Sequence, residues 1–205
     1  MIGVIDYGMS NLTCVVAAIE RLGYSVTTSQ DPAIVAASDK IILPGVGAFG
    51  DAMASLNKLG FSGALNEHVR DGGKPFLGIC LGAQLICKNS DEHGECDGLG
   101  WANAVVREIQ RVPTTLRVPH TGWDSVEGMA SIPLFSDIPK DALFYYTHSH
   151  AIFPHDESMV VGTCSYGSPF ASALSIGDNI FATQFHPEKS QKWGLALLDN
   201  FLVHC

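Results

Sequence analysis

The sequence is short of charge, and above all of positive charge. Charged residues make up 16% of the chain, and 12 lysines and arginines face 21 aspartates and glutamates, which gives a formal net charge of −9. Such a field repels phosphate backbones and anionic lipid, so we expect neither nucleic acid nor a membrane as a partner. The acidity favours ordinary solubility over a special acidic docking surface.

Long apolar runs are also missing. No segment reaches the ~18 consecutive apolar residues of a membrane span, and the amino terminus has no basic stretch followed by an apolar one. We therefore expect a cytoplasmic protein. Its six cysteines (14, 80, 87, 96, 164 and 205) lack the spacing of a disulfide framework, so in a reducing compartment we expect thiols.

What the chain does have is a hydrophobic content of 46% and 21 glycines, which is typical of a compact enzyme. We expect a single domain, residues 1–205. In its first half, β-branched runs alternate with amphipathic segments: strands are expected at 2–6, 25–28, 40–43 and 75–79, and helices at 11–22, 49–59, 62–71 and 81–87. This alternation predicts an α/β fold with a mixed, mainly parallel sheet flanked by helices.

The second half has a different pattern. A polar, glycine-rich stretch runs to Gly98, and β-rich segments follow at 101–112 and 141–153. A hairpin is expected at 171–176 and 179–184, turning at Gly177 and Asp178, and a helix at 192–204 closes the chain. These segments predict an antiparallel extension of the sheet.

The strongest local signal is Gly78-Ile79-Cys80-Leu81-Gly82, a G-x-C-x-G at the point where a strand gives way to a helix. A sharp turn there, with glycines on both sides, projects the central side chain at the carboxyl edge of the sheet. The N–H groups at the start of the helix, that of Leu81 first, can stabilise an oxyanion. The pattern therefore predicts a nucleophile at Cys80.

A thiol nucleophile needs a base, and Gln184-Phe185-His186-Pro187-Glu188 offers one just beyond a strand. Glu188 can fix the tautomer of His186 and stabilise its imidazolium, as the third member of a catalytic triad does. An isolated H-x-E is a weak motif, but with the cysteine turn it predicts the triad Cys80, His186 and Glu188.

Two other patterns allow different functions. Residues 45–50 satisfy G-x-G-x-x-G between a strand and a helix, which is the context of a dinucleotide-binding module. Against that function, the motif follows the third strand and lacks an acidic residue for a ribose; its peptide could instead complete an oxyanion hole beside Cys80. Cys87, His93 and Cys96 lie close in sequence but lack zinc-site pairing, so we expect no metal.

These motifs resemble class I (triad) glutamine amidotransferases, and among them the glutaminase subunits of imidazole glycerol phosphate synthases. The resemblance runs nearly end to end. It includes 6–8 with 11–12, 43–49, 78–82, 98–100, 122–123, 148–149 and 184–190. It implies a flavodoxin-like fold and a glutaminase that uses neither cofactor nor metal.

The resemblance also implies roles for individual residues. Cys80 would attack the side-chain amide of glutamine, form a thioester and release ammonia, with His186 moving the proton. The oxyanion hole would comprise Leu81 with the reorienting peptide of Val46 and Gly47. Glutamine would be held by Gln84, His148, Ser149 and His150.

The implied partner is a cyclase of (β/α)₈ barrel type, joined in a heterodimer that forms imidazole glycerol phosphate and an aminoimidazole carboxamide ribotide in histidine biosynthesis. Trp123, Tyr145 and Lys189 are interface candidates, although plain packing would also explain them. The chain departs from the family at Ser10, Cys14, Thr121 and His150. A different synthase, such as one that builds amidino sugars of surface polysaccharide, therefore stays open as the ammonia acceptor, and a free-standing cysteine hydrolase is a further alternative.

Overall fold

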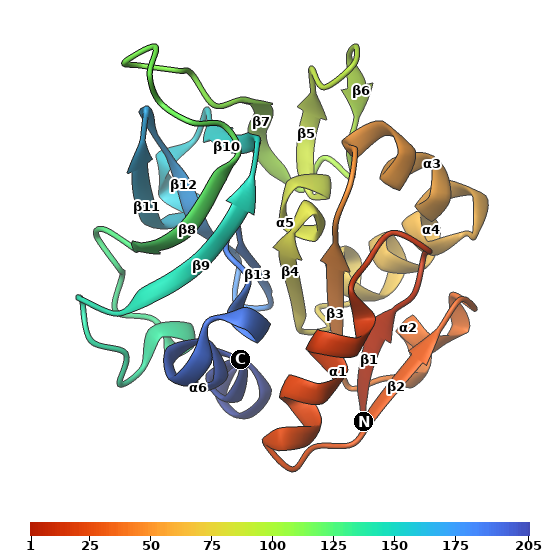
Figure 1. Ribbon diagram of the computed structural model, residues 1–205. Helices are drawn as coiled ribbons and strands as arrows, with labels where there is room; N and C mark the ends of the chain where they lie inside the picture. The colour runs from red at the N-terminus through yellow and green to blue at the C-terminus, as the bar shows by residue number, and fades with distance from the viewer.

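A single mixed sheet runs through the molecule, which is described for residues 1–205 by a computed structural model (Figure 1). Its eleven strands follow the order β2-β1-β3-β4-β13-β12-β10-β7-β5-β6, and β11 pairs with β12 outside this path. A separate two-stranded sheet, β8-β9, packs beside it. None of the helices combines the length and the apolar character of a membrane span.

The elements of the first half alternate as the sequence predicts. They are β1 (Ile2–Ile5), α1 (Leu12–Arg21), β2 (Val26–Ser29), α2 (Ala33–Ala37), β3 (Lys40–Gly45), α3 (Phe49–Lys58), α4 (Phe61–Leu65), a π-helical segment (Asn66–Asp71), β4 (Phe76–Cys80) and α5 (Leu81–Leu85). Strands β1, β2, β3 and β4 are all parallel to their neighbours.

The second half adds the antiparallel strands. Its elements are β5 (Cys87–Ser90), β6 (Cys96–Asp97), β7 (Ala102–Glu108), β8 (His120–Ser125), β9 (Leu143–His148), β10 (His150–Pro154), β11 (Val160–Tyr166), β12 (Ser168–Ile176), β13 (Ile180–Thr183) and α6 (Gln191–His204), with short 3₁₀ turns at Pro133–Phe135, Glu157–Met159 and Pro187–Lys189. The predicted hairpin is confirmed as β12-β13, and β13 also lies parallel to β4.

Helices cover both faces of the sheet, as the parallel strands require. In β3, Ile41 and Leu43 point into a core shared with α2, α3, α4 and α5, whereas Ile42 points to the opposite face. That second face is covered by α1, α6 and the β8-β9 sheet. Because side chains alternate along a strand, a continuous apolar run such as 41–43 supplies both cores.

Elements α2, β6, β8 and β11 form where none was expected, and three of the expected elements differ in the structure. The helix expected at 81–87 ends at Leu85, because the N–H groups of Leu99 and Trp101 bond to the carbonyls of Leu85 and Ile86, and Cys87 begins β5. The segment expected at 141–153 is two strands in two sheets, since β9 pairs with β8 and β10 with β7. The helix expected at 62–71 becomes π-helical from Asn66.

Candidate active site

Cys80 lies at a sharp turn between β4 and α5. Its backbone has φ 54° and ψ −108°, a conformation that is rare for a residue with a side chain and that clusters at functional sites. The turn fits because Gly82 has no Cβ: an added Cβ would lie 1.8 Å from the carbonyl oxygen of Leu43. The glycines of the G-x-C-x-G motif therefore permit the close approach of α5 to β3.

His186 reaches the same edge of the sheet from far along the chain. Strand β13 lies next to β4 and parallel to it, with Thr183 opposite Ile79. Both strands therefore end at the same carboxyl edge of the sheet. The N–H of His186 donates to the carbonyl of Tyr145 at 2.9 Å, and the hydroxyl of Ser190 donates to the carbonyl of His186 at 2.6 Å. These bonds fix the backbone of the histidine.

The ring of His186 is held by Glu188. Their Nδ1 and Oε1 atoms are 2.7 Å apart, and both side chains are almost fully buried. Since a carboxylate only accepts, Nδ1 carries the proton and Nε2 is left to act on the thiol. Nε2 is buried and bonds to no nitrogen or oxygen of the chain.

The charges of the three side chains support one another. Burial alone would lower the pKa of His186, but the nearby Cys80 sulfur and then the Glu188 carboxylate outweigh burial and raise the pKa of His186 above its ordinary value. His186 can therefore hold the proton that the Cys80 sulfur loses when it acts as a nucleophile.

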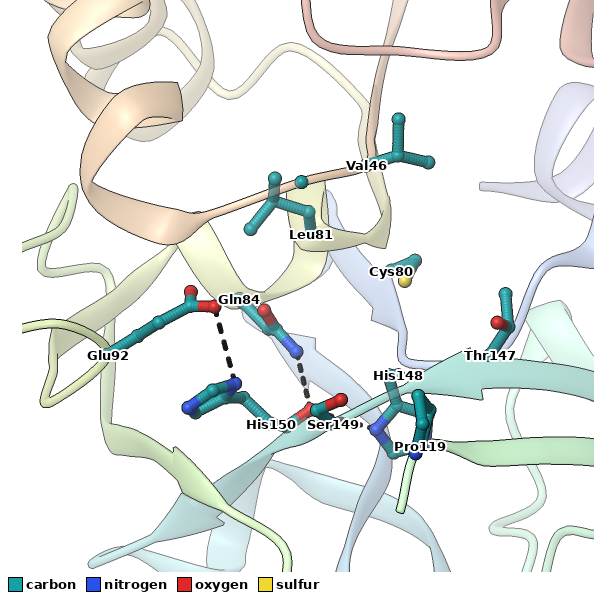
Figure 2. A pocket seen from close by; sticks show the side chains of 11 residues that line it. Val46, Cys80, Leu81, Gln84, Glu92, Pro119, Thr147, His148, Ser149 and His150 are labelled. Atoms are coloured by element: carbon teal, nitrogen blue, oxygen red, sulfur yellow. Dashed lines mark hydrogen bonds and ion pairs between the residues drawn. The ribbon is translucent and has the colours of Figure 1, made fainter.

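Cys80 opens into a cavity of about 320 Å³ lined by eleven residues (Figure 2). The lining includes all four residues predicted to hold glutamine, Gln84, His148, Ser149 and His150, as well as Leu81, Val46 and Gly47 of the predicted oxyanion hole; Glu92, Pro119 and Thr147 complete it. Segments from five parts of the chain thus meet around one thiol.

The Gln84 side chain joins α5 to the start of β10 and to Gln184. Its Nε2 donates to the carbonyl of His150 at 2.8 Å and to Oε1 of Gln184 at 3.1 Å. Gln184 in turn places its own Nε2 at 3.8 Å from Sγ of Cys80. A short chain of amides therefore fixes the cavity wall next to the nucleophile.

Glu92, which the sequence analysis missed, contributes a carboxylate to the cavity. Its Oε2 accepts the N–H of Phe49 at the first turn of α3 (2.7 Å), and its Oε1 lies 3.4 Å from Nδ1 of His150. The sequence shows only an acidic residue in a polar stretch. Its role becomes visible when the pairing of β5 with β7 brings the β5-β6 loop to the cavity.

The two N–H groups expected in the oxyanion hole, those of Leu81 and Val46, differ in their hydrogen bonding. The N–H of Leu81 belongs to the first residue of α5 and has no partner within the helix. The N–H of Val46 donates instead to the carbonyl of Met9 at 2.8 Å. Gly47 follows with φ +107°, a backbone conformation that glycine adopts without strain.

The first glycine of residues 45–50 allows close packing against the turn at Cys80. An added Cβ at Gly45 would lie 2.4 Å from the hydroxyl oxygen of Tyr7 and 2.9 Å from the backbone nitrogen of Gly82. The segment thus runs tightly against the turn that carries Cys80. The trio Cys87, His93 and Cys96 is dispersed, with Cys87 in the apolar core and Cys96 on β6.

The three interface candidates lie near one another but outside the cavity. Trp123 on β8 is 44% exposed, and its ring centroid is 5.8 Å from that of Tyr145 on β9. Lys189 belongs to the turn after His186 and is partly exposed. This surface therefore adjoins the segment that carries His186 and Glu188.

Comparison with known proteins agrees with this geometry. The model of the class-I glutamine amidotransferase family matches residues 3–205. The chain is 46% identical to the imidazole glycerol phosphate synthase subunit HisH of Moorella thermoacetica over 98% of this chain and 93% of that one. It is 43% identical to the HisH subunit of Aquifex aeolicus, over 97% and 94%.

Solved structures share the fold at low sequence identity. A crystal structure of a glutamine amidotransferase superposes with a TM-score of 0.74 at 17% identity, covering 98% of this chain and 99% of that one. The chain therefore belongs to the class-I glutamine amidotransferase family, and within it to the HisH subunits of imidazole glycerol phosphate synthase.

Proposed function

We propose that the protein hydrolyses the side-chain amide of glutamine through a thioester on Cys80 and supplies ammonia to imidazole glycerol phosphate synthesis. The observation that carries the proposal is the strained Cys80 turn beside a buried His186 whose Nδ1 is held by Glu188 at 2.7 Å. This arrangement supplies a nucleophile, a base and a group that orients the base.

The reaction follows from these positions. The Cys80 thiolate attacks the amide carbon, and the imidazolium of His186 donates its Nε2 proton to the departing nitrogen, so ammonia leaves and a glutamyl thioester remains. The same Nε2 then takes a proton from water, which attacks the thioester and releases glutamate. In both steps the Glu188 carboxylate stabilises the positively charged ring of His186 and does not take its proton.

The cavity offers groups for both ends of glutamine. Its α-ammonium would lie against Glu92, the one carboxylate in the lining, and the backbone of Ser149 and His150 would bind the α-carboxylate. Gln84 would hold the wall through its bond to His150. A volume of about 320 Å³ suits a small amino acid.

The oxyanion hole would be completed only when the Val46 peptide turns. While its N–H bonds to Met9, the developing oxyanion has the Leu81 N–H alone, and a missing donor costs about 2.7–4 kcal/mol of transition-state stabilisation. We therefore expect slow hydrolysis by the isolated protein and faster hydrolysis when a partner favours the turned peptide.

We infer that this partner is a (β/α)₈ barrel cyclase, and that the two subunits work as a heterodimer in the cytoplasm. Two features support the docking surface: Trp123 and Leu143 are large apolar residues exposed at 44% and 48%, and both line a hollow of about 470 Å³ with Trp193. The identity to HisH subunits favours this acceptor over a synthase of amidino sugars.

The test is ammonia release from glutamine by the complex with the cyclase. Cys80→Ala should abolish it while complex formation persists, and Cys96→Ala, which removes another thiol, should leave the rate unchanged. Undiminished release by the Cys80 variant would rule out the mechanism.

A further inference from the structure

A second cluster of reactive side chains lies outside the cavity, beside His148. His120 and Asp124 come from β8 and Cys164 from β11, and their potential ligand atoms all lie within 4.8 Å of one another. His120 and Cys164 are buried, whereas the Asp124 side chain is 39% exposed. None of the three lines the cavity around Cys80.

The ring of His120 is fixed in orientation by two tyrosines. It stacks on Tyr146 with centroids 4.8 Å apart and on Tyr166 with centroids 3.9 Å apart, at interplanar angles of 18° and 14°. Its Nδ1 lies 3.3 Å from Nε2 of His148, and its Nε2 lies 3.6 Å from Oδ2 of Asp124. The two stacking contacts hold the plane of the ring in place.

The hydrogen bonds determine where the protons of the two histidines are. Nδ1 of His148 faces the carbonyl of His150 at 2.8 Å, and since a carbonyl only accepts, this nitrogen carries a proton. In a neutral imidazole only one ring nitrogen carries a proton, so the Nε2 of His148 acts as an acceptor. The contact between the rings then requires the proton of His120 on Nδ1.

The Nε2 of neutral His120 therefore presents a lone pair to the carboxylate of Asp124. Two electron-pair donors that face each other need a proton or a cation near both. The nearby thiol of Cys164, whose sulfur lies within 4.8 Å of both atoms, supplies a proton in the metal-free protein.

We propose that His120, Asp124 and Cys164 form a binding site for a divalent transition-metal ion of the zinc type. An imidazole nitrogen, a carboxylate oxygen and a thiolate sulfur are the ligands that zinc takes in proteins. Binding would release the Cys164 proton to solvent, and the charges of the carboxylate and thiolate would then balance the dication. The fourth position is open to water on the exposed Asp124 side.

The geometry requires only a small adjustment. Tetrahedral zinc with bonds of about 2.0–2.3 Å places its ligand atoms roughly 3.3–3.8 Å apart. The His120 and Asp124 atoms already lie 3.6 Å apart, and the partly exposed Asp124 side chain can rotate toward the sulfur. His148 accepts the other ring proton of His120, as the outer partner of a metal-binding histidine usually does. The ion would tie the β8-β9 sheet to β11.

The test uses Co²⁺ as a spectroscopic probe with protein that carries no histidine tag and has been treated with a chelator. Because Cys80 and His186 could themselves bind a metal, the starting protein is the Cys80→Ala variant. We expect one Co²⁺ per chain, a thiolate-to-metal charge-transfer band and about one proton released per ion at neutral pH. The melting temperature should rise by roughly 5–10 °C at a hundredfold excess over Kd.

Matched variants assign the signal. Adding Cys164→Ser, a nearly isosteric change, should remove the charge-transfer band and the proton release, and Asp124→Asn on the exposed side should weaken binding at least about tenfold. Adding Cys96→Ser should change neither. The proposal would be overturned if the starting protein showed no charge-transfer band, or if the band survived Cys164→Ser. The cluster would then hold only a proton.

Discussion

In the proposed chemistry, Glu188 has one role, which is to hold and stabilise the ring of His186. Its carboxylate only accepts the Nδ1 proton of His186, at 2.7 Å and out of contact with water. This contact selects the tautomer whose Nε2 faces the thiol, and it stabilises the positive ring that forms during each proton transfer. The burial of both groups makes the pair stronger than it would be in water.

Glu92 is the residue whose proposed role is most specific to substrate binding. Glu92→Gln keeps the acceptor for the Phe49 N–H but removes the charge opposite the α-ammonium of glutamine. The loss of a charged hydrogen bond, about 1.5–3 kcal/mol, should raise KM for glutamine roughly 10- to 100-fold with a smaller effect on kcat. Steady-state kinetics of the complex measure both constants.

The matched control is Glu95→Gln in the same loop, where the side chain accepts from Asn89 outside the cavity. It should leave KM unchanged. An unaltered KM in the Glu92 variant would place the ammonium of glutamine elsewhere.

Among the elements, the β4-α5 turn depends most on one missing side chain. Gly82→Ala should destabilise the protein by at least about 3 kcal/mol or prevent folding, because the new Cβ would lie 1.8 Å from the Leu43 carbonyl. Urea unfolding followed by circular dichroism measures the change.

Gly63→Ala in α4 is the control, since an added Cβ there meets nothing within 4 Å. It should be neutral or stabilise the helix by up to about 1 kcal/mol. Equal effects of the two substitutions would show that the turn tolerates a side chain and that its glycines have another purpose.

The sequence predicts elements well where the pattern is local. Alternating apolar segments identify the parallel strands, and the G-x-C-x-G motif identifies the turn at Cys80. Prediction fails where an element depends on residues that are distant in the sequence. The helix expected at 81–87 ends early and β5 begins because the N–H groups of Leu99 and Trp101 bond to the carbonyls of Leu85 and Ile86. Glu92 and the cluster of His120 with Cys164 were missed for the same reason, since only sheet topology brings them to their neighbours.

At the scale of the whole molecule, buried histidines link stability to pH. Burial lowers the pKa of His148 from 6.5 to about 3, so between these values the unfolded chain takes up a proton that the folded chain does not. The free energy of unfolding should therefore fall as the pH falls through this window, by up to about 1.4 kcal/mol per pH unit for one such group.

His148→Gln should reduce the slope of the free energy of unfolding against pH between pH 6 and 4. Urea unfolding at each pH measures this slope. His155→Gln, at an exposed position, is the control and should leave the slope as it is. An unchanged slope in the His148 variant would mean that this ring is protonated in the folded protein at moderate acidity.

The central claim is that Cys80 is the nucleophile toward glutamine, and affinity labelling tests it most directly. The complex with the cyclase is treated with a diazoketone analogue of glutamine, and each cysteine-containing peptide is then weighed by mass spectrometry. We predict one adduct, on the peptide that contains Cys80, formed in step with the loss of glutaminase activity and prevented by excess glutamine. An adduct on another cysteine, or loss of activity with Cys80 unmodified, would contradict the account.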